Sequence, residues 1–195
     1  MKSTLPRKCL SVATVLATLL SLNLLHASPA LAAGNCGNAK KLVFTVGPSN
    51  TAAGSTISPS IQVAIQTTSG GSTTCTENVA LAIGTNPSSG TLSGTTTVAA
   101  SATTGIATFS NLSINKAGNG YTLTASAPND GTLTPATSGT FTISAGTASR
   151  VAFSVQPSNT TAGATITPAV KVEVRDANGN LVTGSSASVT LAIGT

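Results

Sequence analysis

Apolar side chains alternate with polar ones along most of the chain beyond residue 40. One run places Ile61, Val63 and Ile65 at every second position, with Gln62, Ala64 and Gln66 at the alternate positions. Because successive side chains on a β-strand point to opposite faces, this pattern predicts a strand with one buried and one solvated face. Further runs of the same kind occupy residues 42–46, 79–83, 92–98, 105–109, 121–125, 141–143 and 170–174.

The breaks between these runs carry turn-forming residues, such as Asn86-Pro87 and Gly118-Asn119-Gly120. The apolar phase slips by one after Phe109, which predicts a bulge or bend near Asn111. Beyond residue 32, no stretch keeps a helical period. About eight short strands in about 105 residues predict an all-β fold, an immunoglobulin-like antiparallel β-sandwich.

Two stretches of the chain are copies of each other. Residues 41–59 (KLVFTVGPSNTAAGSTISP) and 150–168 (RVAFSVQPSNTTAGATITP) are identical at 11 of 19 positions, at a constant offset of 109. A second pair, VALAIGT at 79–85 and VTLAIGT at 189–195, follows at an offset of 110. A period of this length indicates tandem domains, because the units of solenoid proteins are shorter.

We therefore divide the chain into a signal segment (1–32), a lead-in (33–40), a first Ig-like repeat (41–146) and a truncated second repeat (147–195). From residue 150 on, the second copy contains 46 residues of a 109-residue period. A half sandwich exposes apolar faces and sheet edges. We therefore expect a fragment of a longer gene product, in which residues 150–195 form a poorly covered partial sheet.

The N-terminal segment has the three-part pattern of a secretory signal peptide. A short basic stretch precedes an apolar run at 10–25, and small residues follow up to Ala32. This pattern predicts cleavage between Ala32 and Ala33 and a secreted or cell-surface destination. An uncleaved anchor is the alternative, although the run is shorter than the ~20 residues that span a bilayer. A lipid anchor at Cys36 is disfavoured, because the residues before it do not form a lipobox.

The cysteines fit an exported chain. Cys9 would leave with the signal, so Cys36 and Cys75 remain as an even pair in an oxidising compartment. We predict a disulfide between them that ties the lead-in to the loop before residue 79. Ser185 stands at the position of Cys75 in the second copy, so the bridge belongs to the first copy only. Two free thiols, or a link to another chain, are the alternatives.

Charge is scarce. Only 7% of the residues are charged, and the formal net charge of +5 includes Lys2, Arg7 and Lys8 of the signal segment. Six cations and four acids remain beyond it, a balance of +2 without a basic run. Nucleic-acid binding requires a basic face, so no nucleic-acid partner is predicted. The one histidine, His26, also lies in the signal, so the exported chain lacks the commonest general base and metal ligand.

Few residues are candidates for chemistry. Glu77 and Asp130 belong to different loops and are interpreted as solvated residues, not as a glycosidase pair. The sequence DANGN at 176–180 resembles the start of a calcium loop, but no bidentate glutamate follows, and the first copy has TTSGG there. A hairpin turn, with Asn-Gly supplying positive φ, is favoured. Tyr121 is expected in the core or as a tyrosine-corner analogue. No catalytic, cofactor-binding or metal-binding residue and no small-molecule substrate are predicted.

The motifs PSNTxAG, VxLAIGT, TLSGTTTV, GIATFSNLSI and GYTLTAS, within residues 40–195, resemble the bacterial Ig-like tandem repeats, which include invasin- and intimin-type surface modules. The resemblance implies sandwiches of about seven to nine strands strung into stalks. It also implies that any adhesive activity usually lies in other, terminal domains. Cys36 and Cys75 depart from the family pattern.

The leading hypothesis is a non-catalytic spacer or stalk module of an exported bacterial protein, whose partners are neighbouring repeats of the same chain. One alternative is an adhesive or polysaccharide-binding module with an unknown cell-wall or host-surface ligand, since loops on rigid scaffolds carry recognition. These loops, however, have few aromatic or Arg residues, which dominate interface energies. Another alternative is an accessory domain of a larger secreted enzyme.

Overall fold

The computed structural model describes residues 36–194. The predicted signal segment, with its cleavage position between Ala32 and Ala33, lies outside the described residues. All regular secondary structure in the described part is β-strand, which confirms the all-β prediction. No helix among residues 36–194 is long and apolar enough to cross a membrane.

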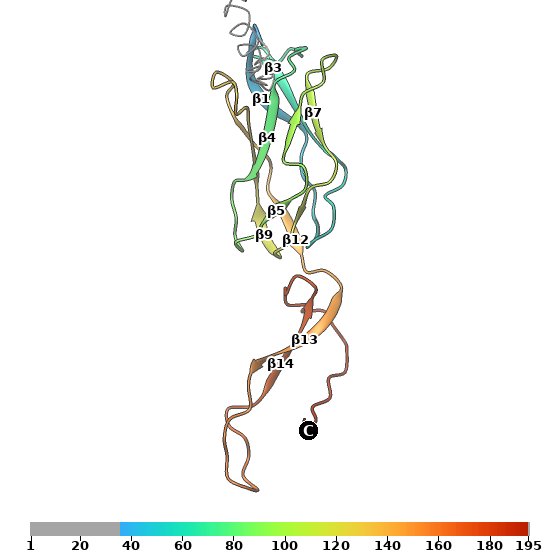
Figure 1. Cartoon of the computed structure of the whole chain (residues 1–195), viewed down its shortest axis with the longest axis vertical. Helices are drawn as coiled ribbons and strands as arrows, with labels where there is room; N and C mark the ends of the chain where they lie inside the picture. Colours follow the sequence, from blue (N-terminus) through green and yellow to red (C-terminus); the bar gives the residue numbers. More distant parts are fainter. Residues whose placement is uncertain (1–35, 195) are drawn as a thin grey trace, which may run out of the picture. The chain divides into compact units, whose positions relative to one another are not determined.

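Within the described residues, twelve strands lie in the first copy and its connections (Figure 1): β1 (Ala39–Val46), β2 (Thr51–Ala52), β3 (Ile61–Thr67), β4 (Asn78–Ile83), β5 (Leu92–Ser93), β6 (Thr97–Ala99), β7 (Ile106–Phe109), β8 (Ser113–Ile114), β9 (Gly118–Tyr121), β10 (Leu123–Ser126), β11 (Ala136–Thr137) and β12 (Phe141–Ser144). Two longer strands follow in the second copy, β13 (Ala148–Val155) and β14 (Lys171–Asp176).

Most of these strands pair antiparallel. One sheet has the order β1-β3-β7, and another has the order β11-β10-β4-β6. β12 lies between β9 and β2, and its pairing with β2 is parallel. β5 and β8 form a separate short pair. The buried apolar side chains of these sheets form one core cluster, as expected for sheets stacked face to face.

The inward positions predicted for the run at 61–65 are buried. Ile61, Val63 and Ile65 of β3 are at most 1% exposed. The predicted bend near Asn111 is also present, because the chain leaves the strand geometry after β7 and resumes it at β8. The bend brings Leu112 to 1% exposure, so the slip in the apolar phase keeps side chains on the core side.

The run at 121–125 forms two strands where the sequence predicts one. β9 pairs with β12, whereas β10 pairs with β4 and β11, so the chain changes partners at Thr122. The buried Thr122 hydroxyl accepts the Thr85 amide at 2.7 Å, and its carbonyl accepts the Gly84 amide at 2.8 Å. Apolar alternation continues through this break, so periodicity alone does not reveal it.

The structure contains the predicted Cys36–Cys75 disulfide. It joins the segment before β1 to the loop between β3 and β4, with the two Cα atoms 5.0 Å apart. The cysteines are separated by 39 residues in the sequence. A closed loop of that size stabilises the folded state by about 3–4 kcal/mol in the loop-entropy account.

The first strand pair of the second copy reproduces that of the first. Every residue pair of β1 with β3 recurs 109 positions later in β13 with β14, including both register shifts. Burial differs, however. Val151 and Phe153 of β13 are 58% and 46% exposed, whereas Leu42, the counterpart of Val151, is 3% exposed. The second copy therefore has the local structure of the first without its apolar cover.

Candidate functional site at the 176–180 turn

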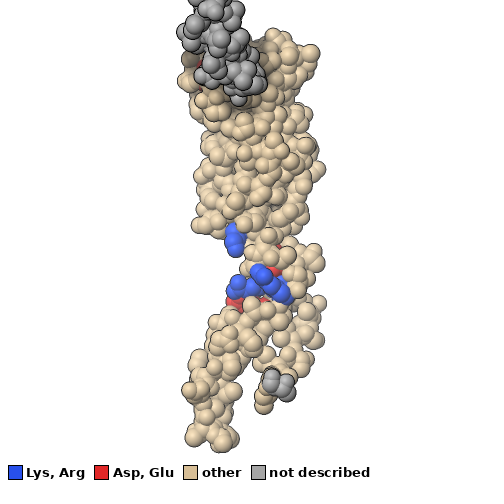
Figure 2. All heavy atoms as spheres, viewed as in Figure 1, with Lys and Arg blue, Asp and Glu red and all other residues tan. Residues whose placement is uncertain are grey.

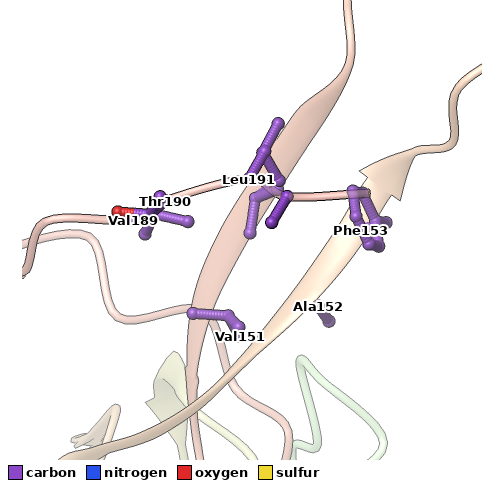
Figure 3. A pocket seen from close by; sticks show the side chains of 8 residues that line it. Val151, Ala152, Phe153, Val189, Thr190 and Leu191 are labelled. Atoms are coloured by element: carbon purple, nitrogen blue, oxygen red, sulfur yellow. The ribbon is translucent and has the colours of Figure 1, made fainter. Parts of the chain in front are cut away.

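An apolar groove of about 210 Å³ lies on the second copy (Figure 3). It is lined by residues 151–153 of β13, Val172 of β14 and residues 189–192. In the first copy the corresponding positions are core residues: Leu42, Val63, Val79 and Leu81 are at most 4% exposed. Ligand pockets usually add several convergent polar groups to apolar walls, and among these lining side chains only Thr190 is polar. The groove is therefore an uncovered core surface, not a site shaped around a ligand.

Asp130 and Glu77, the acidic residues of the first copy, lie in different surroundings. Asp130 lies in the turn between β10 and β11, where its Oδ1 accepts the Thr132 hydroxyl at 2.6 Å and the Thr132 amide at 2.9 Å. These bonds hold the pKa of Asp130 below its usual value. No group of three His, Cys, Asp or Glu side chains in the described part of the chain is placed to hold a metal ion.

The prediction that Glu77 is a solvated loop residue is wrong. Glu77 is 2% exposed, because it lies between the disulfide-bonded Cys75 and the start of β4, at the edge of the core. Its Oε1 accepts the Asn78 amide at 3.1 Å, and its Oε2 has no hydrogen-bond partner among the described residues.

The turn at 176–180 is a hairpin turn, as the sequence predicts. The Gly179 amide donates to the Asp176 carbonyl at 3.1 Å, and the Asp176 amide donates to the Asn180 carbonyl at 3.0 Å. The chain then returns along β14, where Arg175 pairs with Leu181. Positive φ occurs at Gly179 (82°) but not at Asn178, so the glycine alone provides the left-handed residue.

Asp176 is the best-connected buried acid of the described residues. It is 1% exposed. Its Oδ1 accepts the Asn180 amide at 2.8 Å, and its Oδ2 accepts both the Asn180 side-chain amide and the Gly146 amide, each at 2.8 Å. Burial raises the pKa of Asp176, but the hydrogen bonds from Asn180, Gly146 and Asn178 outweigh it and hold the pKa below its usual value.

Asn180 connects this turn to the first copy. Its Oδ1 accepts the Ala117 amide at 3.0 Å, and its Nδ2 donates to the Asn115 carbonyl at 3.0 Å. With the bond to Asp176, both N–H groups and the oxygen of the Asn180 side chain are used. Asn180 is 8% exposed, so its side-chain polar atoms are removed from water and are satisfied by the first copy and by Asp176.

Asn178 makes the second connection. Its Nδ2 donates to the Ala53 carbonyl at 3.2 Å, and its own carbonyl accepts the Lys116 ammonium at 3.3 Å. A Cβ on Gly54 would lie 2.7 Å from Asn178 Nδ2, so the contact depends on a glycine there. We call residues 53–54 and 115–117 of the first copy the acceptor surface, because they receive the turn.

Tyr121 supports the acceptor surface from inside the first copy. The fully buried Tyr121 donates its hydroxyl to the Lys116 carbonyl at 2.9 Å, five residues upstream, and its ring lies 5.9 Å from that of Phe141. The expectation that Tyr121 lies in the core is confirmed. A tyrosine corner also has a hydroxyl that donates to the backbone a few residues upstream. The bond fixes the backbone that Asn180 and Asn178 contact.

Charged side chains gather in one region of the face drawn in Figure 2. The cations Lys116 and Arg175 contact the turn. Lys116 donates to the Asn178 carbonyl, and the Arg175 guanidinium donates to the Gly179 carbonyl at 3.4 Å. Arg175 also forms an ion pair with Glu173 at 2.6 Å. The two carboxylate oxygens of Asp176 already accept three N–H groups. Calcium requires six to eight oxygen ligands, so the arrangement favours a hydrogen-bonded turn over a cation site.

No family model, curated protein or solved structure matches this chain. Sequence reasoning identified 176–180 as a turn but assigned it no contact with the first copy. The available signal was the difference between DANGN in the second copy and TTSGG at 67–71 in the first. A turn needs only the glycine, so the additional Asp and Asn side chains indicated a further role.

Proposed function

We propose that this chain is a non-catalytic spacer module of an exported bacterial surface or secreted repeat protein, built from Ig-like sandwiches. The observation that carries the proposal is the set of direct hydrogen bonds between the turn at 176–180 and the acceptor surface. Such bonds restrict bending between two consecutive copies. A spacer requires this restriction, because a freely bending chain does not keep its two ends apart.

Three features support this proposal. The chain is built from duplicated segments. The Cys36–Cys75 disulfide fits an oxidising compartment outside the cytoplasm. The buried, hydrogen-bonded Asp176 braces a connection instead of facing a cleft, so the best-formed polar cluster of the described chain has a mechanical role.

The function is tested in the full-length protein at the cell surface. Repeats would be deleted or added, and the distance of a terminal epitope from the membrane would be measured by fluorescence localisation. We expect the distance to change in proportion to the number of repeats. An unchanged distance would contradict the proposal. Specific binding of the purified chain on a glycan or matrix-protein array would instead support an adhesive module.

A further inference from the structure

We propose that the side chains at 176, 178 and 180 form a docking element that recognises the end of a preceding β-sandwich repeat. By the same logic, the turn at 67–71, which lacks these side chains, does not dock a repeat in this way. The inference rests on the spacer function and deepens it, since it identifies which residues determine whether a junction is held or free to swing.

The two turns have the same backbone structure, so their side chains carry the difference. In the first copy the Gly70 amide donates to the Thr67 carbonyl, and the Thr67 amide donates to the Gly71 carbonyl, both at 3.0 Å. The Gly71 amide donates to Thr67 Oγ1 at 3.0 Å, as the Asn180 amide donates to Asp176 Oδ1. Thr67 thus replaces Asp176 within the turn.

What the first copy lacks is the outward-reaching part of the network. A threonine hydroxyl offers one oxygen where the carboxylate of Asp176 offers two, and it is the second oxygen that holds the Gly146 amide. Gly71 has no side chain in place of Asn180, and the Ser69 hydroxyl, in place of Asn178, interacts with Thr67 Oγ1 of its own turn at 3.0 Å. Thr67 and Ser69 therefore bond within their own turn, and the Thr68 carbonyl accepts the Lys41 ammonium of the same copy at 3.4 Å.

The acceptor surface is recognised largely through its main chain. Asn180 binds the Asn115 carbonyl and the Ala117 amide, and Asn178 binds the Ala53 carbonyl. A repeat of different sequence but the same backbone would present the same groups. The partner that fits is therefore another β-sandwich repeat with a positive-φ glycine at the position of Gly54, which leaves room for Asn178.

The second copy carries part of an acceptor surface of its own. Gly163, the counterpart of Gly54, has a φ of 81° against 79°, and the space where its Cβ would stand is open. The turn and the acceptor surface are different parts of a repeat, so the contact is heterologous and joins repeats head to tail. In such a junction the docking turn belongs to one repeat and the acceptor surface to the repeat before it.

The chain contains its own control for a test. Replacing DANGN by TTSGG (Asp176→Thr, Ala177→Thr, Asn178→Ser, Asn180→Gly) keeps Gly179 and substitutes a turn that already folds in the first copy. Amide hydrogen exchange would be followed by NMR in the full exported chain. We expect exchange at Ala117 and Gly146 to accelerate at least tenfold, with Ile65 in β3 unchanged. If the variant protects the Ala117 and Gly146 amides as well as the wild type does, the proposal is overturned.

Two further variants distinguish docking from a general loss of structure. Asn180→Ala removes only the side chain that reaches Ala117 and should accelerate exchange there, leaving the Gly179 amide protected. Ser69→Ala, at the counterpart of Asn178, should change neither Ala117 nor Gly146. Equal effects of the two variants at Ala117 would contradict the proposal. The spacer function is judged separately by epitope distance, so either idea can fail without the other.

Discussion

Asp176 accepts a hydrogen bond from the backbone amide of Gly146 at 2.8 Å, although the two residues are 30 positions apart. Gly146 lies between β12 and β13, in the segment that connects the two copies. The same carboxylate holds the side chain of Asn180, which reaches the first copy at Ala117. One buried acid therefore ties together the connecting segment, the hairpin turn of the second copy and the end of the first.

Substitution of Asp176 by Asn should destabilise this arrangement. An amide keeps one acceptor but places N–H donors where the carboxylate receives N–H groups, so at least one buried donor loses its partner. Losing hydrogen bonds to a charged group typically costs about 1.5–3 kcal/mol. We expect the free energy of opening at the Gly146 amide, measured by hydrogen exchange, to fall by about 2 kcal/mol. In Asp130→Asn, where the acid sits in an exposed turn with Thr132, Gly146 should not change.

The stability of the arrangement should also depend on pH. Although burial acts in the opposite direction, the hydrogen bonds hold the pKa of Asp176 below the unfolded value of 3.8. The folded state therefore binds the proton less readily than the unfolded state, and stability rises with pH. The contribution of Asp176 is fully present above the unfolded pKa and is lost as pH falls through the folded pKa.

The measurement is the protection of the Gly146 amide between about pH 6 and pH 2, a range that covers the ordinary titration of an aspartate. Protection beyond the intrinsic pH dependence of exchange should decline at the acid end, and this decline should disappear in Asp176→Asn. The pKa of Asp130 is shifted in the same direction, so global stability alone would not separate the two acids. A Gly146 profile that is identical in both proteins would show that Asp176 is not the titrating group.

Much of the fold follows from residues that the sequence places in alternation. Ile61, Val63 and Ile65 are buried because a period of two turns them to one side. The bend near Asn111 is visible as a phase slip, and the disulfide is predicted by pairing the two cysteines that remain if Cys9 leaves with the signal. These features depend on neighbouring residues or on the number of cysteines, so they can be predicted from the sequence.

Other features depend on which strands meet in space. The change of partners at Thr122 and the parallel pairing of β2 with β12 leave no periodic signal. The burial of Glu77 reflects its place between the Cys75 bridge and β4, which its own polarity does not indicate. The role of Asn180 was hidden for a similar reason, because its partners Asn115 and Ala117 are more than 60 residues away and bind through backbone atoms.

Removal of the Tyr121 hydroxyl should loosen the acceptor surface without emptying the core. Tyr121→Phe keeps the ring that packs near Phe141 and deletes the donor to the Lys116 carbonyl. A net loss of about 1 kcal/mol in the free energy of unfolding is expected for one neutral hydrogen bond. Exchange at Ala117 should accelerate more than exchange in β3. Phe141→Leu, a packing change, should lower global stability without this selective effect.

Reduction of the disulfide should affect the first copy. With Cys36→Ser and Cys75→Ser, the unfolded chain regains the entropy of a 39-residue separation, worth about 3–4 kcal/mol. Urea denaturation followed by the fluorescence of Tyr121, which is fully buried in the first copy, should show a lower midpoint. Equal midpoints for the variant and the oxidised wild type would mean that the bridge does not stabilise the fold.

Two glycines offer a matched pair of substitutions that isolates the contact between the copies. Gly54 and Gly163 have φ values of 79° and 81°, so an alanine at either position pays a similar backbone penalty, about 1 kcal/mol. Only at Gly54 would the new Cβ also meet Asn178, at 2.7 Å from Nδ2, while the space at Gly163 is open. Gly54→Ala should therefore accelerate amide exchange at Ala117 and Gly146, whereas Gly163→Ala should not. Combining Gly54→Ala with Asn178→Ala should remove the steric part of the effect, so the double variant should lose less protection than the two single variants added together. If the losses simply add, the two residues do not touch in solution.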